Sequence, residues 1–134
     1  MPRKPAILVV DDEENITRTL RMVFEQQGYE VTTAYSSAEA VKILKNGHQL
    51  DAVITDLNME KEDIGLEVAR AAQRLHPPPV IVICTGFANL TNAREALNMH
   101  VDYLANKPVD LDELTSAVRR LITRRESALI KGQP

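Results

Sequence analysis

Short apolar runs alternate along the chain with longer stretches in which apolar residues recur every three or four positions. Short runs rich in β-branched residues predict strands, and the longer periodic stretches predict amphipathic helices. We expect strands near residues 6–10, 30–34, 51–55, 80–84 and 101–105. We expect helices near residues 14–27, 37–47, 65–75, 89–98 and 110–125.

The alternation of strands and helices predicts a parallel sheet, because each helix carries the chain back to the same edge in a right-handed crossover. The runs near 6–10, 51–55 and 80–84 are continuously apolar, as in strands that are covered on both faces. The run near 30–34 is more polar and indicates an edge strand. The pattern therefore predicts an α/β fold, a doubly wound five-stranded parallel sheet flanked by five helices.

The helices carry recognisable end signals and apolar stripes. Ser36 with Glu39 matches a capping box before the second helix, and Asp110 with Glu113 matches an acidic version before the fifth. In the first helix one apolar stripe is expected to face the sheet, formed by Ile16, Leu20, Val23 and Phe24.

The stripe of the fifth helix continues past the expected domain edge, with apolar spacing that has no break until Gly132. We therefore predict helix at least to Ala128, the alternative being a frayed tail with incidental Leu129 and Ile130. Such an extension could join an output domain or pair with a second copy of the chain.

Length and composition exclude several classes of protein. A chain of 134 residues with 44% hydrophobic residues fits one globular domain. The net charge of −3 gives no electrostatic case for direct nucleic-acid binding. No apolar run approaches the roughly 20 residues of a bilayer span, so no membrane insertion is expected. The single cysteine, Cys84, lies inside an apolar run and predicts a buried thiol in a reducing, cytoplasmic setting.

Residues with useful chemistry follow four of the apolar runs. Asp11 and Asp12 follow the first run, Asp56 the third, Thr85 the fourth and Lys107 the fifth. In a parallel sheet these strand ends lie along one edge, where ligands bind. Three carboxylates, one hydroxyl and one ammonium are therefore expected to converge, as suits a divalent cation and a phosphoryl group.

This constellation resembles the receiver domain of two-component response regulators. Asp11 and Asp12 fall at the metal-binding acidic pair of that family, and Asp56 falls at its phospho-accepting aspartate. Thr85 falls at the switch hydroxyl, and Lys107, which precedes a proline, falls at the family's lysine. Each piece alone is common, but all of them occur in order at the ends of apolar runs.

The resemblance covers about residues 5–124 and implies a flavodoxin-like strand order of 2-1-3-4-5. It implies a Mg²⁺ ion held by Asp11 or Asp12, by Asp56 and by the backbone carbonyl of Asn58. It also implies that Asp56 takes a phosphoryl group from a phosphohistidine on a sensor histidine kinase or a histidine phosphotransfer protein. The chain would then be a signalling phosphoacceptor, not a turnover enzyme. Residues 125–134 would be a tail or the start of a linker to an output domain.

Two positions depart from the family pattern. Receivers usually carry an aromatic residue three positions before the lysine, but Leu104 holds that place and Tyr103 comes one residue early. Because successive strand residues face opposite sides of a sheet, Tyr103 is not expected to replace it. A proline is common four positions after the phospho-accepting aspartate, but Glu60 is there. The loop around it is charged and one residue longer than usual, either a solvated loop or a partner-specific surface.

Other interpretations of these residues compete with this one. Asp11 and Asp12 could cap the following helix. A phosphatase of the haloacid-dehalogenase kind would carry a second carboxylate two residues after the nucleophile, where this chain has Asn58. The remaining alternative is a receiver-like interaction domain that signals without phosphorylation, which Leu104 keeps open.

Overall fold

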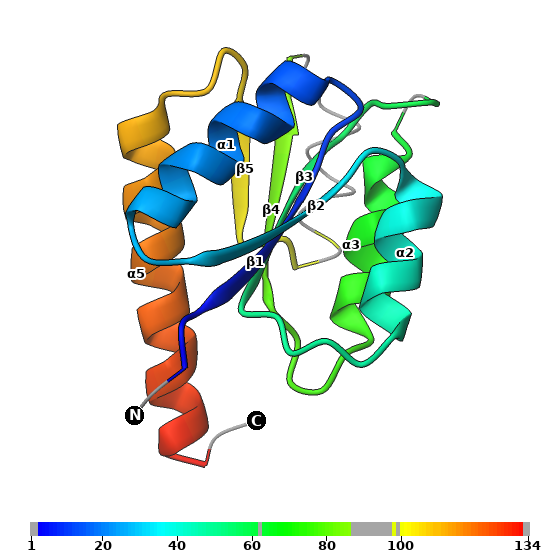
Figure 1. Ribbon diagram of the computed structural model, residues 1–134. Coiled ribbons are helices and arrows are strands. Elements are labelled where there is room, and N and C mark those ends of the chain that lie inside the picture. Colours follow the sequence, from blue (N-terminus) through cyan, green and yellow to red (C-terminus); the bar gives the residue numbers. More distant parts are fainter. Residues whose placement is uncertain (1–2, 62, 87–97, 99, 133–134) are drawn as a thin grey trace.

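The computed structural model describes residues 3–61, 63–86, 98 and 100–132, and in these residues the predicted alternation of strands and helices is present (Figure 1). The strands are β1 (Ala6–Val10), β2 (Glu30–Ala34), β3 (Ala52–Asp56), β4 (Val80–Thr85) and β5 (Tyr103–Asn106). The helices are α1 (Glu14–Gln26), α2 (Ser37–Lys45), α3 (Gly65–Gln73) and α5 (Leu111–Ile130). The helix expected near 89–98 lies almost wholly outside the described residues.

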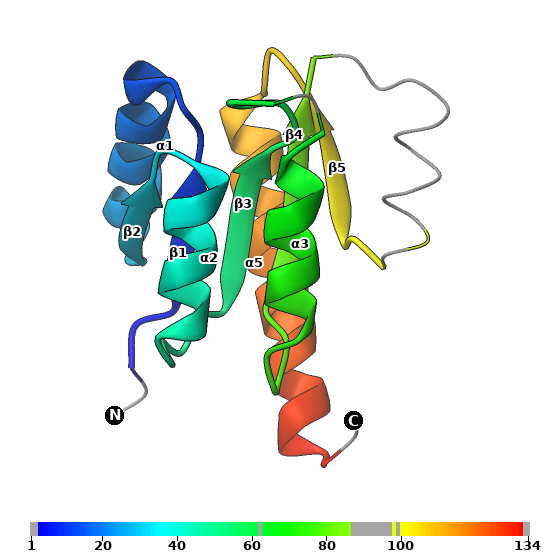
Figure 2. The same ribbon diagram turned by 90° about the vertical axis from the view of Figure 1, so that its right-hand side faces the viewer.

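All five strands pair in parallel, in the order β2-β1-β3-β4-β5. Helices α1 and α5 cover one face of the sheet, and α2 and α3 lie on the other (Figure 2). Every residue of β3 and β4 is buried, whereas β2 lies at an edge and alternates between buried and more exposed positions. The predicted fold class, strand order and edge strand are therefore confirmed.

Strand boundaries differ from the prediction by one or two residues. β3 runs one residue later than expected and includes Asp56, which pairs with Cys84, while β4 continues through Thr85, which pairs with Asn106. β5 begins only at Tyr103. The residue before it, Asp102, donates its backbone N–H to the Ile81 carbonyl and accepts the Ile81 N–H with its carboxylate. Backbone pairing, not hydrophobicity, sets these ends, so polar residues belong to the strands.

The buried stripe predicted for the first helix is confirmed at Leu20 and Phe24 but differs at its start. Thr17 is fully buried with Leu20 and Phe24, and its hydroxyl donates to the Glu14 carbonyl. Ile16 was expected in the stripe but is 36% exposed. Residues 17, 20 and 24 sit on the side of α1 that faces the sheet, so Ile16 falls at the margin of that side.

The predicted helix starts at Ser36 and Asp110 are confirmed. The Ser36 hydroxyl accepts from the Glu39 N–H, and the Asp110 carboxylate accepts from the Glu113 N–H. At the other end of α1, Gly28 adopts φ +95°, a left-handed conformation that ends helices and suits glycine. Among the described residues no helix is both long enough and apolar enough to span a bilayer.

Helix α5 runs to Ile130 and passes the N-terminal edge of the sheet, which confirms helix beyond Ala128 (Figure 1). Arg125 anchors this extension, because its guanidinium donates to the Pro78 carbonyl at 2.7 Å and to Asp51 at 3.2 Å. Asp51 is buried and also binds Arg3 at 2.9 Å and the Ala6 N–H at 2.7 Å. One carboxylate therefore ties the N-terminal segment and α5 to the sheet.

If this anchor orders the extension, Arg125→Ala should speed amide exchange at residues 126–130. We expect exchange to become roughly ten- to a hundredfold faster, since a hydrogen bond to a charged group contributes about 1.5–3 kcal/mol. Arg124→Ala, which removes a neighbouring exposed arginine, is the control and should leave exchange unchanged. Equal exchange in both variants would show that the helix holds its last turns without Asp51.

Candidate functional site at the carboxyl edge of the sheet

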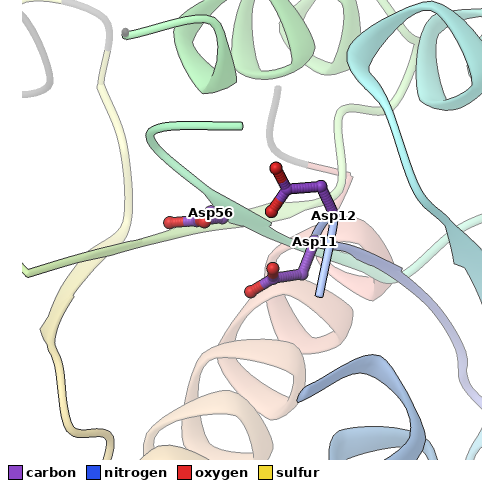
Figure 3. A group of neighbouring side chains, drawn as sticks. All are labelled: Asp11, Asp12 and Asp56. Carbon is purple, nitrogen blue, oxygen red and sulfur yellow. The ribbon is translucent and has the colours of Figure 1, made fainter. Parts of the chain in front are cut away.

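Three aspartates meet where β1 and β3 end. Asp11 and Asp12 follow β1 and Asp56 closes β3, and one carboxylate oxygen from each lies within 4.8 Å of the others (Figure 3). Asp11 and Asp56 are buried, 3% and 8% exposed, whereas Asp12 is open to solvent. Carboxylate oxygens in this arrangement suit a hard divalent cation that keeps some of its waters.

The ammonium of Lys107 lies against two of these carboxylates. Its Nζ is 3.1 Å from Asp56 Oδ1 and 3.6 Å from Asp11 Oδ2. The backbone N–H of Lys107 donates to the Thr85 carbonyl at 2.9 Å, which fixes the lysine to the end of β4. Thr85 itself is buried, and the Lys107–Pro108 peptide bond is cis. The structure thus brings the predicted residues to one edge.

Burial and mutual repulsion favour protonation of the carboxylates. Burial raises the pKa of Asp11 to about 6, and the neighbouring Asp56 and Asp12 act in the same direction. The pKa of Asp56 is also raised, by burial above all, although Lys107 and a hydrogen bond from the Asn58 backbone oppose the rise. Burial alone would lower the pKa of Lys107, but its contacts with Asp56 and Asp11 outweigh burial and raise it. The cluster holds more negative charge than Lys107 alone neutralises.

The capping alternative for the acidic pair holds only in part. Glu13 is the residue before α1, and no side chain caps that helix. Asp11 Oδ1 accepts the Glu13 N–H at 2.9 Å while its other oxygen faces Lys107. Asp11 therefore supports the entry to α1 and also belongs to the carboxylate cluster.

The loop between β3 and α3 packs closely against the backbone of the site. The Asn58 side-chain oxygen accepts the Asp63 N–H at 2.7 Å, where Asp63 adopts φ +59°. Gly65 donates its N–H to the Leu57 carbonyl, and a Cβ atom there would lie 2.1 Å from the Asp56 carbonyl oxygen. Sequence reasoning assigned Gly65 no role, although a glycine opening a helix is a signal of close backbone approach.

Glu60 contacts a different helix, so its loop is more than a solvated connection. Its carboxylate accepts from the backbone N–H and the hydroxyl of Ser37, the first residue of α2. Burial acts to raise the pKa of Glu60, but the Ser37 hydrogen bonds outweigh burial and lower it. The sequence shows an unusual residue here but carries no pattern that pairs it with Ser37.

The structure places Leu104 and Tyr103 on opposite faces of the sheet. Leu104 packs against the core beneath α2 and α3, whereas Tyr103 packs against the core beneath α1 and α5. The Tyr103 hydroxyl donates to Glu113 of α5 at 3.2 Å. Tyr103 therefore does not take the place of the usual aromatic residue, as the alternation of strand residues predicts.

A cavity of about 260 Å³ adjoins the cluster on the α1 side of the sheet. Its polar end is formed by Asp11, Asp56 and Lys107, and its walls include Ile16, Leu20 and Cys84. Cys84 is buried as predicted, and burial raises the pKa of its thiol to about 12. The thiol therefore stays protonated at neutral pH, and Ile16 borders the cavity instead of the core.

Comparison with known proteins identifies the family. A model of the response regulator receiver domain matches residues 7–119. The chain belongs to this family. The transcriptional regulatory protein GlrR of Escherichia coli (strain K12) is 34% identical over 119 residues, which make up 88% of this chain and 26% of that protein. The response regulator ArlR of Staphylococcus aureus (strain Mu50 / ATCC 700699) is 30% identical over 89% of this chain and 53% of that protein.

This receiver chain thus spans between about a quarter and about half of those two curated relatives. A receiver domain protein from Clostridium thermocellum superposes with a TM-score of 0.82 at 33% identity, covering 91% of this chain and 97% of that one. A CheY-like receiver from Methanospirillum hungatei JF-1 superposes with a TM-score of 0.85, covering 92% and 98%. Its identity of 24% supports the fold alone. The chain is a response regulator receiver of the two-component class.

Asp12 should matter for metal binding more than for folding. Asp12→Ala should weaken Mg²⁺ binding at least about tenfold, since even groups that only orient metal ligands contribute roughly 10- to 100-fold. It should also raise the melting temperature of the metal-free protein, because it relieves repulsion in the cluster. Calorimetric titration and thermal melting measure the two effects, with Glu13→Ala as control. A metal-free melting temperature several degrees lower would assign Asp12 a structural role.

The raised pKa of Asp11 predicts a pH dependence of metal-free stability. Between the ordinary value of 3.8 and about 6, the folded protein binds more protons at Asp11 than the unfolded chain. The free energy of unfolding should therefore fall as pH rises through this window, by at most about 3 kcal/mol from this group. Denaturant unfolding from pH 4 to 7 should show a steeper fall in the wild type than in Asp11→Asn. Parallel curves would contradict the assignment.

Proposed function

We propose that the protein is a phospho-accepting receiver in a two-component phosphorelay, with Asp56 as the acceptor. The observation that carries this proposal is the contact of Lys107 with Asp56 inside a cluster of three carboxylates at the carboxyl edge of the sheet. A carboxylate oxygen of Asp56 would form the new bond to phosphorus while the bond from phosphorus to the donor breaks. The product would be an aspartyl phosphate.

The neighbouring side chains would position the phosphoryl group and neutralise its charge. Transfer of this kind needs little more from a protein than alignment and electrostatic stabilisation. Lys107 is already within hydrogen-bond distance of Asp56 and would donate to a phosphoryl oxygen. Thr85 closes the adjacent strand β4, and its hydroxyl would bind another oxygen once the group arrives.

The carboxylate cluster fits Mg²⁺ in its chemistry. Asp11, Asp12 and Asp56 would hold the ion together with the backbone carbonyl of Asn58, all of them oxygen ligands. The bound ion would neutralise charge on the transferring phosphoryl oxygens. Three carboxylates beside one ammonium leave excess negative charge, which favours binding of a cation.

The proposal makes the chain a self-modifying signalling protein, not an enzyme with many turnovers. A phosphatase of the haloacid-dehalogenase kind, which works through an aspartyl phosphate, carries a second carboxylate two residues after the nucleophile, where Asn58 stands. The side-chain oxygen of Asn58 is bonded to the Asp63 N–H, and its amide is no acid. A second candidate, an interaction domain that signals without phosphorylation, draws support from Leu104 at the usual aromatic position.

The partners proposed on this basis are a sensor histidine kinase or a histidine phosphotransfer protein in the cytoplasm. Residues 5–124 would form the receiver unit, and residues 125–134 would lead from it as a tail or linker. The helical extension through Ile130, with Ile130 85% exposed, supports a contact there with a second copy or with an output domain. GlrR is a transcriptional regulatory protein and ArlR is a response regulator, which fits such an output.

The proposal predicts one phosphoryl adduct on the wild-type protein after incubation with Mg²⁺ and acetyl phosphate. Intact-mass measurement should show this adduct, and Asp56→Asn should abolish it because the attacking oxygen is lost. Asp112→Asn, a change of an exposed carboxylate on α5, is the matched control and should still be modified. An adduct that persists in Asp56→Asn would place the acceptor elsewhere.

The same incubation separates the competing functions. A single adduct that accumulates supports the receiver, whereas phosphate released over many turnovers would indicate a phosphatase. Protein that takes no phosphoryl group, with acetyl phosphate left intact, would favour the interaction domain.

A further inference from the structure

The loop that follows Asp56 is joined to α2 by one side chain. Glu60 Oε1 accepts from the Ser37 N–H at 3.0 Å and from the Ser37 hydroxyl at 2.5 Å. The two residues are 23 positions apart, so the contact links the β3–α3 loop to another part of the fold. Glu60 is exposed and Ser37 is half-buried, and neither belongs to the hydrophobic core.

The start of α2 is well suited to hold a carboxylate. The first N–H groups of a helix have no partner within the helix, and the helix dipole favours negative charge there. The Ser36 hydroxyl accepts the Glu39 N–H, and the Glu60 carboxylate accepts the N–H of Ser37. A carboxylate that accepts two hydrogen bonds from one residue is held in position as well as in orientation.

The loop also has internal hydrogen bonds. Its hydrogen bonds from Met59 to the Lys61 carbonyl and from Asp63 to the Asn58 side chain fold the loop onto itself. Those bonds set the shape of the loop, and the bonds between Glu60 and Ser37 set its place relative to α2.

We propose that Glu60 is a positioning residue for the phosphorylation site, which acts by fastening the β3–α3 loop to the first residue of α2. Asn58 lies two residues before Glu60, and its carbonyl is a proposed metal ligand. With the loop fastened, this carbonyl keeps a fixed place beside Asp56. Without Ser37 as partner, the loop would sample other positions, and the metal would lose part of a preorganised ligand set. This inference rests on the proposed function and adds a residue to it.

Four variants test the proposal. Glu60→Ala removes both hydrogen bonds, and Glu60→Gln keeps an oxygen that can accept them. Ser37→Pro removes both donors from the other side, at a first helical position where proline is well tolerated and after a residue, Ser36, that is already extended. Glu67→Ala removes an exposed carboxylate from the first turn of α3 and is the control.

The full chain is titrated with Mg²⁺ alone by calorimetry, then phosphorylated with acetyl phosphate at limiting and at saturating Mg²⁺, and melted. Glu60→Ala and Ser37→Pro should each weaken Mg²⁺ binding roughly three- to tenfold, somewhat less than typical for a group bonded to a metal ligand. A fifth protein, which combines Glu60→Ala with Ser37→Pro, should bind Mg²⁺ no more weakly than either single variant, because both changes remove the same contact. Glu60→Gln should recover most of the affinity, and Glu67→Ala should match the wild type.

Saturating Mg²⁺ should restore most of the phosphorylation rate in the weakened variants, and melting temperatures should stay close to that of the wild type. Wild-type affinity in both Glu60→Ala and Ser37→Pro, in protein that is phosphorylated normally, would overturn the role of Glu60 and leave the proposed function standing. Affinity lost only in proportion to melting temperature would also overturn it, since the contact would then be merely structural. Wild-type protein that takes no phosphoryl group would overturn the proposed function and this inference together.

Discussion

The contact between the Lys107 ammonium and the buried carboxylates of Asp11 and Asp56 is the interaction on which this molecule depends. Charges so deeply buried are unfavourable unless they are paired, and here one cation faces more than one anion. The fold tolerates the imbalance because β1 and β3 end side by side and the backbone of Lys107 is bonded to the end of β4, next to β3. The pKa values of Asp11 and Asp56 are raised because the charged form of each carboxylate is unfavourable in this arrangement. The proposed binding of a cation would relieve part of this repulsion between carboxylates.

Much of the fold and of the candidate site could be predicted from the sequence, because both depend on local sequence patterns. Apolar runs and helical periodicity predict the sheet and its edge strand, and polar residues after the runs predict which side chains meet. The ends of the strands are predicted less accurately, because Asp56 and Thr85 take part in backbone pairing that the apolar pattern does not reveal. Ile16 and Thr17 show the same limit on a helix, where a buried hydroxyl satisfied by the Glu14 carbonyl replaces an expected apolar contact.

Contacts between residues far apart in sequence could not be predicted in this way. Glu60 with Ser37 and Arg125 with Asp51 are pairs of common residue types, and nothing in their neighbourhoods marks them as partners. Gly65 lies against the Asp56 carbonyl only because α3 approaches the end of β3 so closely. These long-range contacts determine where loops and helix ends lie around the predicted site. The local sequence patterns predict which residues form the site but not these positions.

The anchor at Asp51 has a mechanical consequence. From Arg125 to Ile130 the helix rises about 8 Å, at about 1.5 Å per residue. Because Arg125 donates to Asp51 and to the Pro78 carbonyl, a displacement of the helix end at Ile130 would act on the sheet through these two contacts. Asp51 directly precedes β3 and Asp56 ends it, so this one strand connects the anchor of the helix with the carboxylate cluster.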